Sequence, residues 1–142
     1  MNFQYATNES LTPEELKELF LSIRWFSGHY SQKLTQAMEN SSMVFTARHR
    51  GKLIALASTL DDGVLTAYLH NLLVHPDYQG LGIGRTLVKK VKEYYKDYPY
   101  LLVIPEEKRN IAFFEDLGFE PIENAIPMQN KDILIYLTEC FF

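Results

Sequence analysis

Three glycines stand at alternate positions between two apolar segments, and this arrangement suits the binding of a phosphate group. Gly80, Gly82 and Gly84 follow the apolar run 72–74, and Pro76 ends the strand that this run predicts. A strand, a glycine turn and a helix N-terminus together present backbone N–H groups and a positive dipole end to an anion. The helix is predicted from apolar residues with a 3.6-residue period: Ile83, Leu87, Val91 and Tyr94 or Tyr95.

The spacing of the glycines excludes two common phosphate-binding motifs. The dinucleotide motif G-x-G-x-x-G requires a glycine where this chain has Arg85 or Leu87, and the Gly-Lys-Ser/Thr of a P-loop is absent. Instead, residues 79–84 (QGLGIG) resemble the Q/R-x-x-G-x-G/A signature of the GCN5-related N-acetyltransferases. Residues 110–119 (NIAFFEDLGF) are similar to a second block of that family, N-x-x-A-x-x-(F/Y)-x-x-x-G-F. Two blocks at the family's spacing make the resemblance specific.

The resemblance implies that the chain binds acetyl-CoA in an opening beside the strand that precedes the glycine turn. In the family, the backbone of this strand pairs with the pantetheine arm, as an added strand would, and the turn holds the pyrophosphate. Asn110 matches the residue that bonds the pantetheine arm, although a helix cap would explain it equally. The cofactor-binding positions implied are Leu72, Leu73, Val74, Gln79, Gly80, Leu81, Gly82, Ile83, Gly84, Arg85, Asn110 and Phe113.

The reaction implied is direct attack of a neutral amine on the thioester carbonyl. It requires a base for the ammonium proton, a donor for the oxyanion and a proton for the leaving thiolate. A backbone N–H near Leu73 or Val74 can be the oxyanion donor. Where many family members carry a basic glutamate, this chain has His70, which is either the base or a strand histidine that merely packs. The family's proton-donating tyrosine aligns with Phe114, which leaves Tyr136 or a water for that role.

Four aromatic residues are candidates for binding the acceptor amine. Trp25, Phe26, Tyr30 and Tyr68 lie in segments that flank the family's substrate cleft, although ordinary packing would account for them equally. The sequence around the strand resembles small-molecule, aralkylamine-type acetyltransferases. The function predicted is therefore acetyl transfer to a small primary amine. Two alternatives stay open: acetylation of a protein N-terminus or lysine, and an acyl-CoA-binding regulatory module without turnover.

The elements that must position these residues can be predicted from local patterns. Thr12, Pro13 and Glu15 form a complete helix start, with a cap, a first-turn proline and a capping box. Helices are expected from Pro13, Ser31, Ile83 and Asn110, and strands at 2–7, 43–49, 53–60, 64–74, 100–104 and 133–138. This order predicts one α/β (α+β) domain over residues 1–142, with a mixed, mostly antiparallel sheet flanked by helices, as in the acetyltransferase family.

Composition places further limits on the function. The net charge of −4 and the pI near 5.5 give no electrostatic reason to expect nucleic-acid or membrane partners, and a metal is not expected. The single cysteine, the absence of a signal-peptide pattern and the lack of a long apolar run predict a cytoplasmic protein. Homodimerisation is implied by the resemblance alone.

Overall fold

The computed structural model describes residues 1–133, and these residues form two compact units. The N-terminal unit comprises Met1–Val103, and the C-terminal unit begins at Ile104. Each unit is described by itself. Within residues 1–133, every helix is too short or too polar to cross a lipid bilayer. The strand predicted for 133–138 lies, from Leu134 on, outside the described residues.

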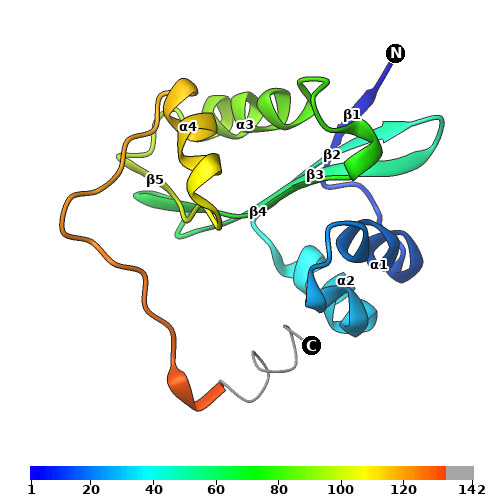
Figure 1. Ribbon diagram of the computed structural model, residues 1–142, viewed down its shortest axis with the longest axis horizontal. Helices are drawn as coiled ribbons and strands as arrows, with labels where there is room; N and C mark the ends of the chain where they lie inside the picture. The colour runs from blue at the N-terminus through cyan, green and yellow to red at the C-terminus, as the bar shows by residue number, and fades with distance from the viewer. Residues whose placement is uncertain (134–142) are drawn as a thin grey trace. The chain divides into compact units, whose positions relative to one another are not determined.

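The N-terminal unit contains a five-stranded sheet, which confirms the predicted fold class (Figure 1). Its strands are β1 (Gln4–Thr7), β2 (Met43–His49), β3 (Lys52–Asp61), β4 (Thr66–Val74) and β5 (Tyr100–Val103), and they neighbour one another in that order. The first four are antiparallel, whereas β5 runs parallel to β4. β4 begins two residues later than predicted, because the N–H groups of Val64 and Leu65 bond the Asp62 carboxylate in the preceding turn.

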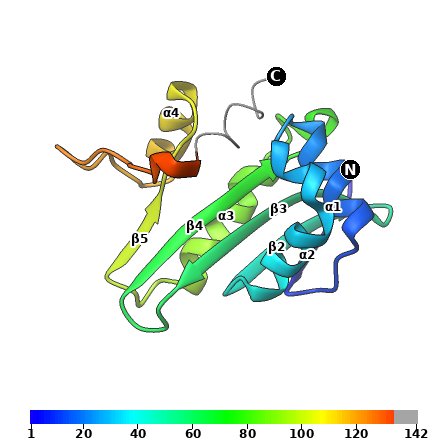
Figure 2. The same ribbon diagram turned by 90° about the horizontal axis from the view of Figure 1, so that it is seen from below.

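Helices cover both faces of this sheet (Figures 1 and 2). α1 (Pro13–Ser22) and α2 (Ser31–Asn40) lie on one face, and α3 (Ile83–Tyr94) lies on the other. The predicted capping box of α1 is confirmed, since Thr12 and Glu15 exchange two hydrogen bonds of 2.7 and 3.2 Å. The core between α1, α2 and the sheet contains Leu16, Leu19, Phe20, Leu34, Met38, Val44, Leu53, Leu56 and Leu73.

Tyr95 rather than Tyr94 continues the buried face of α3. Its ring is buried, and its hydroxyl donates to Asp61 Oδ2 at 2.6 Å and lies 2.5 Å from Thr59 Oγ1. Burial raises the pKa of Tyr95, and the Asp61 carboxylate raises it further. Tyr94 is half exposed. The end of α3 is thereby anchored to the end of β3.

The C-terminal unit contains α4 (Lys108–Asp116) and a 3₁₀ turn at Lys131–Ile133. The expectation that Asn110 caps this helix is wrong: the N-cap is Glu107, and Asn110 is the third helical residue. The chain is already helical at Lys108, so the Asn110 N–H bonds the Glu107 carbonyl instead. Gly118 follows the helix in the left-handed region, with φ of 91°.

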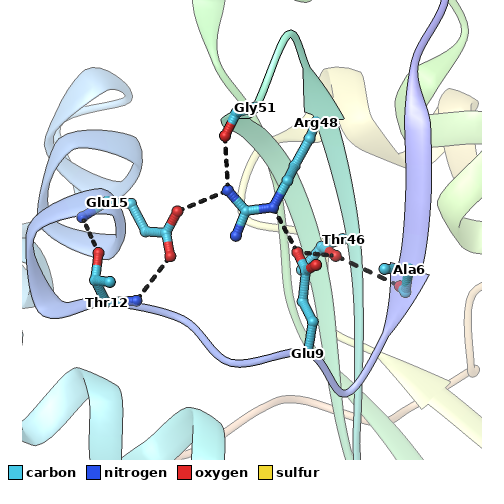
Figure 3. Close-up of polar contacts among 7 residues, drawn as sticks. All are labelled: Ala6, Glu9, Thr12, Glu15, Thr46, Arg48 and Gly51. Atoms are coloured by element: carbon cyan, nitrogen blue, oxygen red, sulfur yellow. Dashed lines mark hydrogen bonds and ion pairs between the residues drawn. The ribbon is translucent and has the colours of Figure 1, made fainter.

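Arg48 joins three segments of the N-terminal unit (Figure 3). Its guanidinium donates to Glu9 at 2.8 Å, to Glu15 at 2.7 Å and to the Gly51 carbonyl at 2.9 Å. The buried Thr46 hydroxyl also donates to Glu9. Partial burial acts to raise the pKa of Glu15, but hydrogen bonds from Arg48 and Thr12 outweigh it and hold that pKa below its ordinary value. The network ties the start of α1 to the β2–β3 hairpin.

We predict that Arg48→Met lowers the free energy of unfolding at pH 7 by about 2 kcal/mol, because two half-buried carboxylates lose their partner. A carboxylate whose pKa is depressed by folding contributes stability above its unfolded pKa of about 4.3, and loses it as the pH falls through the folded pKa. The difference in unfolding free energy between variant and wild type should therefore be smaller at pH 3 than at pH 7, as measured by urea unfolding. Lys52→Met, which breaks the exposed pair with Glu18, is the control and should change little. A constant gap at both pH values would contradict this account.

Candidate functional site

β4 is paired along one edge and largely open along the other. Its pairing with β3 runs from Ala67 to Val74, whereas its pairing with β5 covers only Thr66–Leu69. Within the described part of the N-terminal unit, residues 70–74 have no partner strand on the β5 side, and Figure 2 shows the two strands diverging there. We call the β5 side of residues 70–74 the open edge. Strand backbone at such an edge can pair with an extended ligand.

A β-bulge marks the start of the open edge. Asn71 pairs with Ser58, and Leu69 pairs with Thr59, so His70 is an extra residue on β4. Bulges interrupt the ladder and re-aim side chains, and they are frequent beside active sites. The exposed His70 ring lies 5.4 Å from the Tyr68 ring, centroid to centroid. The candidate base therefore stands at the point where β4 loses its partner.

The register of β4 decides which backbone groups face the open edge. The His75 N–H donates to the Ile54 carbonyl of β3 at 2.8 Å, and the direction of these groups alternates along a strand. Leu73 therefore directs its backbone groups toward β3, while Leu72 and Val74 direct theirs to the open edge. Of the two positions considered for the oxyanion donor, this alternation favours Val74 over Leu73, whose side chain is buried in the core.

The glycine turn follows directly from the open edge. Gly80 and Gly82 have φ of 79° and 83°, in the left-handed region, and Gly82 is the N-cap of α3. A Cβ built at either glycine meets nothing within 4 Å, so their requirement is backbone conformation and not close packing. Gly84 lies in the first turn of α3. The first N–H groups of a helix have no intrahelical acceptor, so the turn and α3 together can bind an anion.

Side-chain contacts that local patterns did not predict hold the turn in place. Gln79 Nε2 donates to the Val74 carbonyl at 3.0 Å, which ties the turn to the end of β4. His75 Nδ1 accepts the Asp77 N–H and so caps a 3₁₀ turn at Pro76–Tyr78. The Tyr78 hydroxyl lies 3.0 Å from His49 Nδ1. His49 and Tyr78 are 29 residues apart, so only the three-dimensional fold reveals this last contact.

Comparison with known proteins decides the family. The model of the acetyltransferase (GNAT) family matches residues 8–119. This chain belongs to the GNAT family. The uncharacterized N-acetyltransferase ycf52 of Pyropia yezoensis is 24% identical, over 80% of this chain and 68% of that protein. Serotonin N-acetyltransferase 2, chloroplastic, of Oryza sativa subsp. japonica is 28% identical, over 78% of this chain and 58% of that protein. A GNAT-family structure from Streptococcus pneumoniae TIGR4 has the same fold, with a TM-score of 0.78 at 23% identity over 91% of this chain and 97% of that one. The protein is therefore an N-acetyltransferase by family.

The aromatic residues predicted for the acceptor lie in three places within this GNAT fold. Trp25 packs against the core, with its ring 5.8 Å from Phe20. Phe26 and Tyr30 contact each other at 5.5 Å in the 3₁₀ turn between α1 and α2. Tyr68 instead contacts His70 on β4. Their roles in substrate binding stay predictions.

The second GNAT block lies in α4 of the C-terminal unit. Asn110 is half-buried there, and the Phe113 ring lies 5.0 Å from the ring of Phe114. Phe114 is buried, and its ring lies 5.5 Å from the ring of Phe119. The contribution of Asn110 and Phe113 to cofactor binding stays a prediction. Tyr136, the predicted proton donor for the thiolate, lies outside the described residues.

We predict that Gly82→Ala weakens acetyl-CoA binding by at least about tenfold, because its Cβ would project into the open space at the turn and strain the N-cap of α3. Gly63→Ala is the matched control: Gly63 has φ of 87°, its Cβ also meets nothing within 4 Å, and it lies in the β3–β4 turn. Both variants should lose similar stability, about 1–2 kcal/mol. Calorimetric titration with acetyl-CoA separates them. Equal affinities in the two variants would remove the turn from the cofactor site.

Proposed function

We propose that this protein transfers the acetyl group of acetyl-CoA to a primary amine of a small molecule, by direct attack of the amine on the thioester. The observation that carries the proposal is the open edge of β4 running into a glycine turn at a helix N-terminus. The outward backbone groups of Leu72 and the outward N–H of Val74 suit an extended pantetheine arm and its thioester. The turn from Gly80 to Gly84 suits a pyrophosphate. Both features support acetyl-CoA as the acetyl donor.

The residues of this site have distinct proposed roles. Acetyl-CoA, when bound, supplies the activated carbonyl. The Val74 N–H donates a hydrogen bond to the carbonyl oxygen as negative charge develops there. His70, at the bulge, accepts the proton of the ammonium, either directly or through a water. The proton for the departing thiolate is assigned to Tyr136 or to water, since Phe114 has none to give.

A small amine is favoured over a protein acceptor by one observation: the rice relative is named for serotonin, which is a small primary amine. The net charge of −4 suits a cationic amine of either kind. A homodimer and a cytoplasmic location remain predictions, as does the absence of nucleic-acid, membrane and metal partners.

We predict that the protein releases CoA thiol from acetyl-CoA when a small primary amine is present. The assay is thiol release against arylalkylamines, polyamines, amino sugars and amino acids, with each product identified by mass spectrometry. Gly82→Ala should abolish most of the release and Gly63→Ala should retain it. Tight acetyl-CoA binding without any release would instead support a protein acceptor or a non-catalytic module.

We predict that His70→Gln lowers kcat about a hundredfold at pH 7 while acetyl-CoA affinity stays within about twofold, because a general base contributes roughly 10²–10⁴ to the rate. Only a neutral imidazole accepts a proton, whereas the amide of glutamine is not a base at any pH. The pH dependence of the rate should therefore differ between the wild type and the variant. The measurement is the pH dependence of kcat/KM for the amine. An unchanged profile would rule out His70 as the base.

A further inference from the structure

Four aromatic rings from three segments of the N-terminal unit meet directly before the glycine turn. Phe3 precedes β1, His49 ends β2, and His75 and Tyr78 follow β4. The ring centroids lie 5.4 Å apart for His49 and Tyr78, 5.7 Å for Phe3 and His49, 5.9 Å for His75 and Tyr78, and 6.2 Å for Phe3 and Tyr78. All four side chains are half-buried. We call these residues the ring cluster.

Tyr78 is the centre of the ring cluster. Its ring contacts the rings of the other three members, and its hydroxyl forms a hydrogen bond of 3.0 Å with His49 Nδ1. Its backbone N–H donates to the His75 carbonyl at 2.8 Å. Tyr78 also ends the 3₁₀ turn and stands two residues before Gly80. The side chain is therefore fixed against the end of β2, while the backbone of the same residue leads into the glycine turn.

The end of β2, to which Tyr78 is bonded, is itself held in place. The residue before His49 is Arg48, whose guanidinium donates to the Gly51 carbonyl of the β2–β3 hairpin and to Glu15 at the start of α1 (Figure 3). His49 thus belongs to a hairpin that is anchored to a helix. A contact with His49 can hold the glycine turn at a constant place relative to the sheet.

A glycine turn needs such an anchor if it is to bind an anion through its backbone. Glycine has more backbone conformations to lose than any other residue, and the free energy of ordering a loop on binding is subtracted from the affinity. The hydrogen bond from Gln79 to Val74 joins residues only five apart in the sequence. The bond from Tyr78 to His49 joins residues 29 apart, so it ties the turn to another strand.

We propose that Tyr78 is a positioning residue, which through its hydrogen bond to His49 holds the glycine turn in the conformation that presents its N–H groups to an anion. This inference rests on the proposed function, in which that anion is the pyrophosphate of acetyl-CoA. The open edge of β4 binds the other end of the same molecule through separate backbone groups. A loosened turn should therefore weaken the binding of the nucleotide end and spare the acyl end.

The test compares acetyl-CoA with S-acetylpantetheine, a donor that lacks the pyrophosphate and the nucleotide, in the full-length protein. Tyr78→Phe keeps the ring and removes the hydroxyl. It should raise the Michaelis constant for acetyl-CoA about fivefold, with kcat within about twofold, because one hydrogen bond of the anchor is lost. The kcat/KM for S-acetylpantetheine should not change. Tyr94→Phe is the matched control, since Tyr94 also contacts neighbouring rings but lies at the opposite end of α3, and it should alter neither donor.

A second variant tests whether the hydrogen bond carries the effect. His49→Phe keeps an aromatic ring beside Phe3 and removes Nδ1. It should raise the Michaelis constant for acetyl-CoA as much as Tyr78→Phe does, and the double variant should raise it no further, because both substitutions break the same bond. A double variant about 25-fold weaker than wild type would show independent effects and overturn the pair.

The remaining outcomes separate this inference from the proposed function. An equal loss with both donors, or an unchanged Michaelis constant for acetyl-CoA in Tyr78→Phe, would overturn the positioning role while acetyl transfer stands. If acetyl-CoA binds without turnover, its dissociation constant from calorimetry replaces the Michaelis constant, and a fivefold rise supports the role. If the wild type does not bind acetyl-CoA, the proposed function fails and hydrogen–deuterium exchange decides. Faster exchange confined to residues 79–84 in Tyr78→Phe would support the role, and exchange equal to that of the wild type, or faster throughout the unit, would overturn it.

Discussion

The site depends on the unequal pairing of one strand. β4 is bonded to β3 along nearly its whole length, which fixes its position, while β5 accompanies it for four residues only. Backbone groups that a strand leaves unpaired require another partner, which is water or an extended ligand. The bulge at His70 coincides with the end of the pairing between β4 and β5. From this residue on, the backbone of β4 is available to an extended ligand. A regular register with a longer β5 would close the edge and remove the site.

The glycine turn is useful only because its position relative to that edge is fixed. Positive φ at Gly80 and Gly82 lets the chain reverse from β4 into α3 without a side chain on the anion-facing side. Gln79 then bonds the turn to the carbonyl of Val74, the same residue whose N–H faces the edge. A pantetheine arm and its pyrophosphate are covalently linked, so the two binding regions must keep a constant separation. This hydrogen bond links them through a single residue of β4.

Features of this fold that arise from local chemistry can be predicted from the sequence, and features that arise from register cannot. The capping box at Thr12 and the glycine turn each depend on a few consecutive residues, and the structure confirms the capping box and the predicted order of strand, glycine turn and helix. The bulge at His70 depends on how β4 aligns with β3, and the short β5 depends on where the chain turns into the next segment. The N-cap of α4 is Glu107 and not Asn110. Several polar residues precede this helix, so the sequence alone does not decide which of them is the cap. The contact of Tyr78 with His49, which is 29 residues away, also has no local signature.

The surroundings of the site bear on the hardest step of acetyl transfer. A thiol with a pKa of about 8.5 leaves readily as a thiolate. The absence of a hydroxyl group at Phe114 should therefore lower the rate of acetyl transfer only slightly. A primary amine with a pKa of about 10 is mostly protonated at neutral pH. It must lose that proton before it can attack the thioester carbonyl. Desolvation disfavours the charged form of an amine and a nearby carboxylate favours it. In the proposed reaction, removal of this proton falls to His70, directly or through a water, so this step should be the one most sensitive to the residue at position 70.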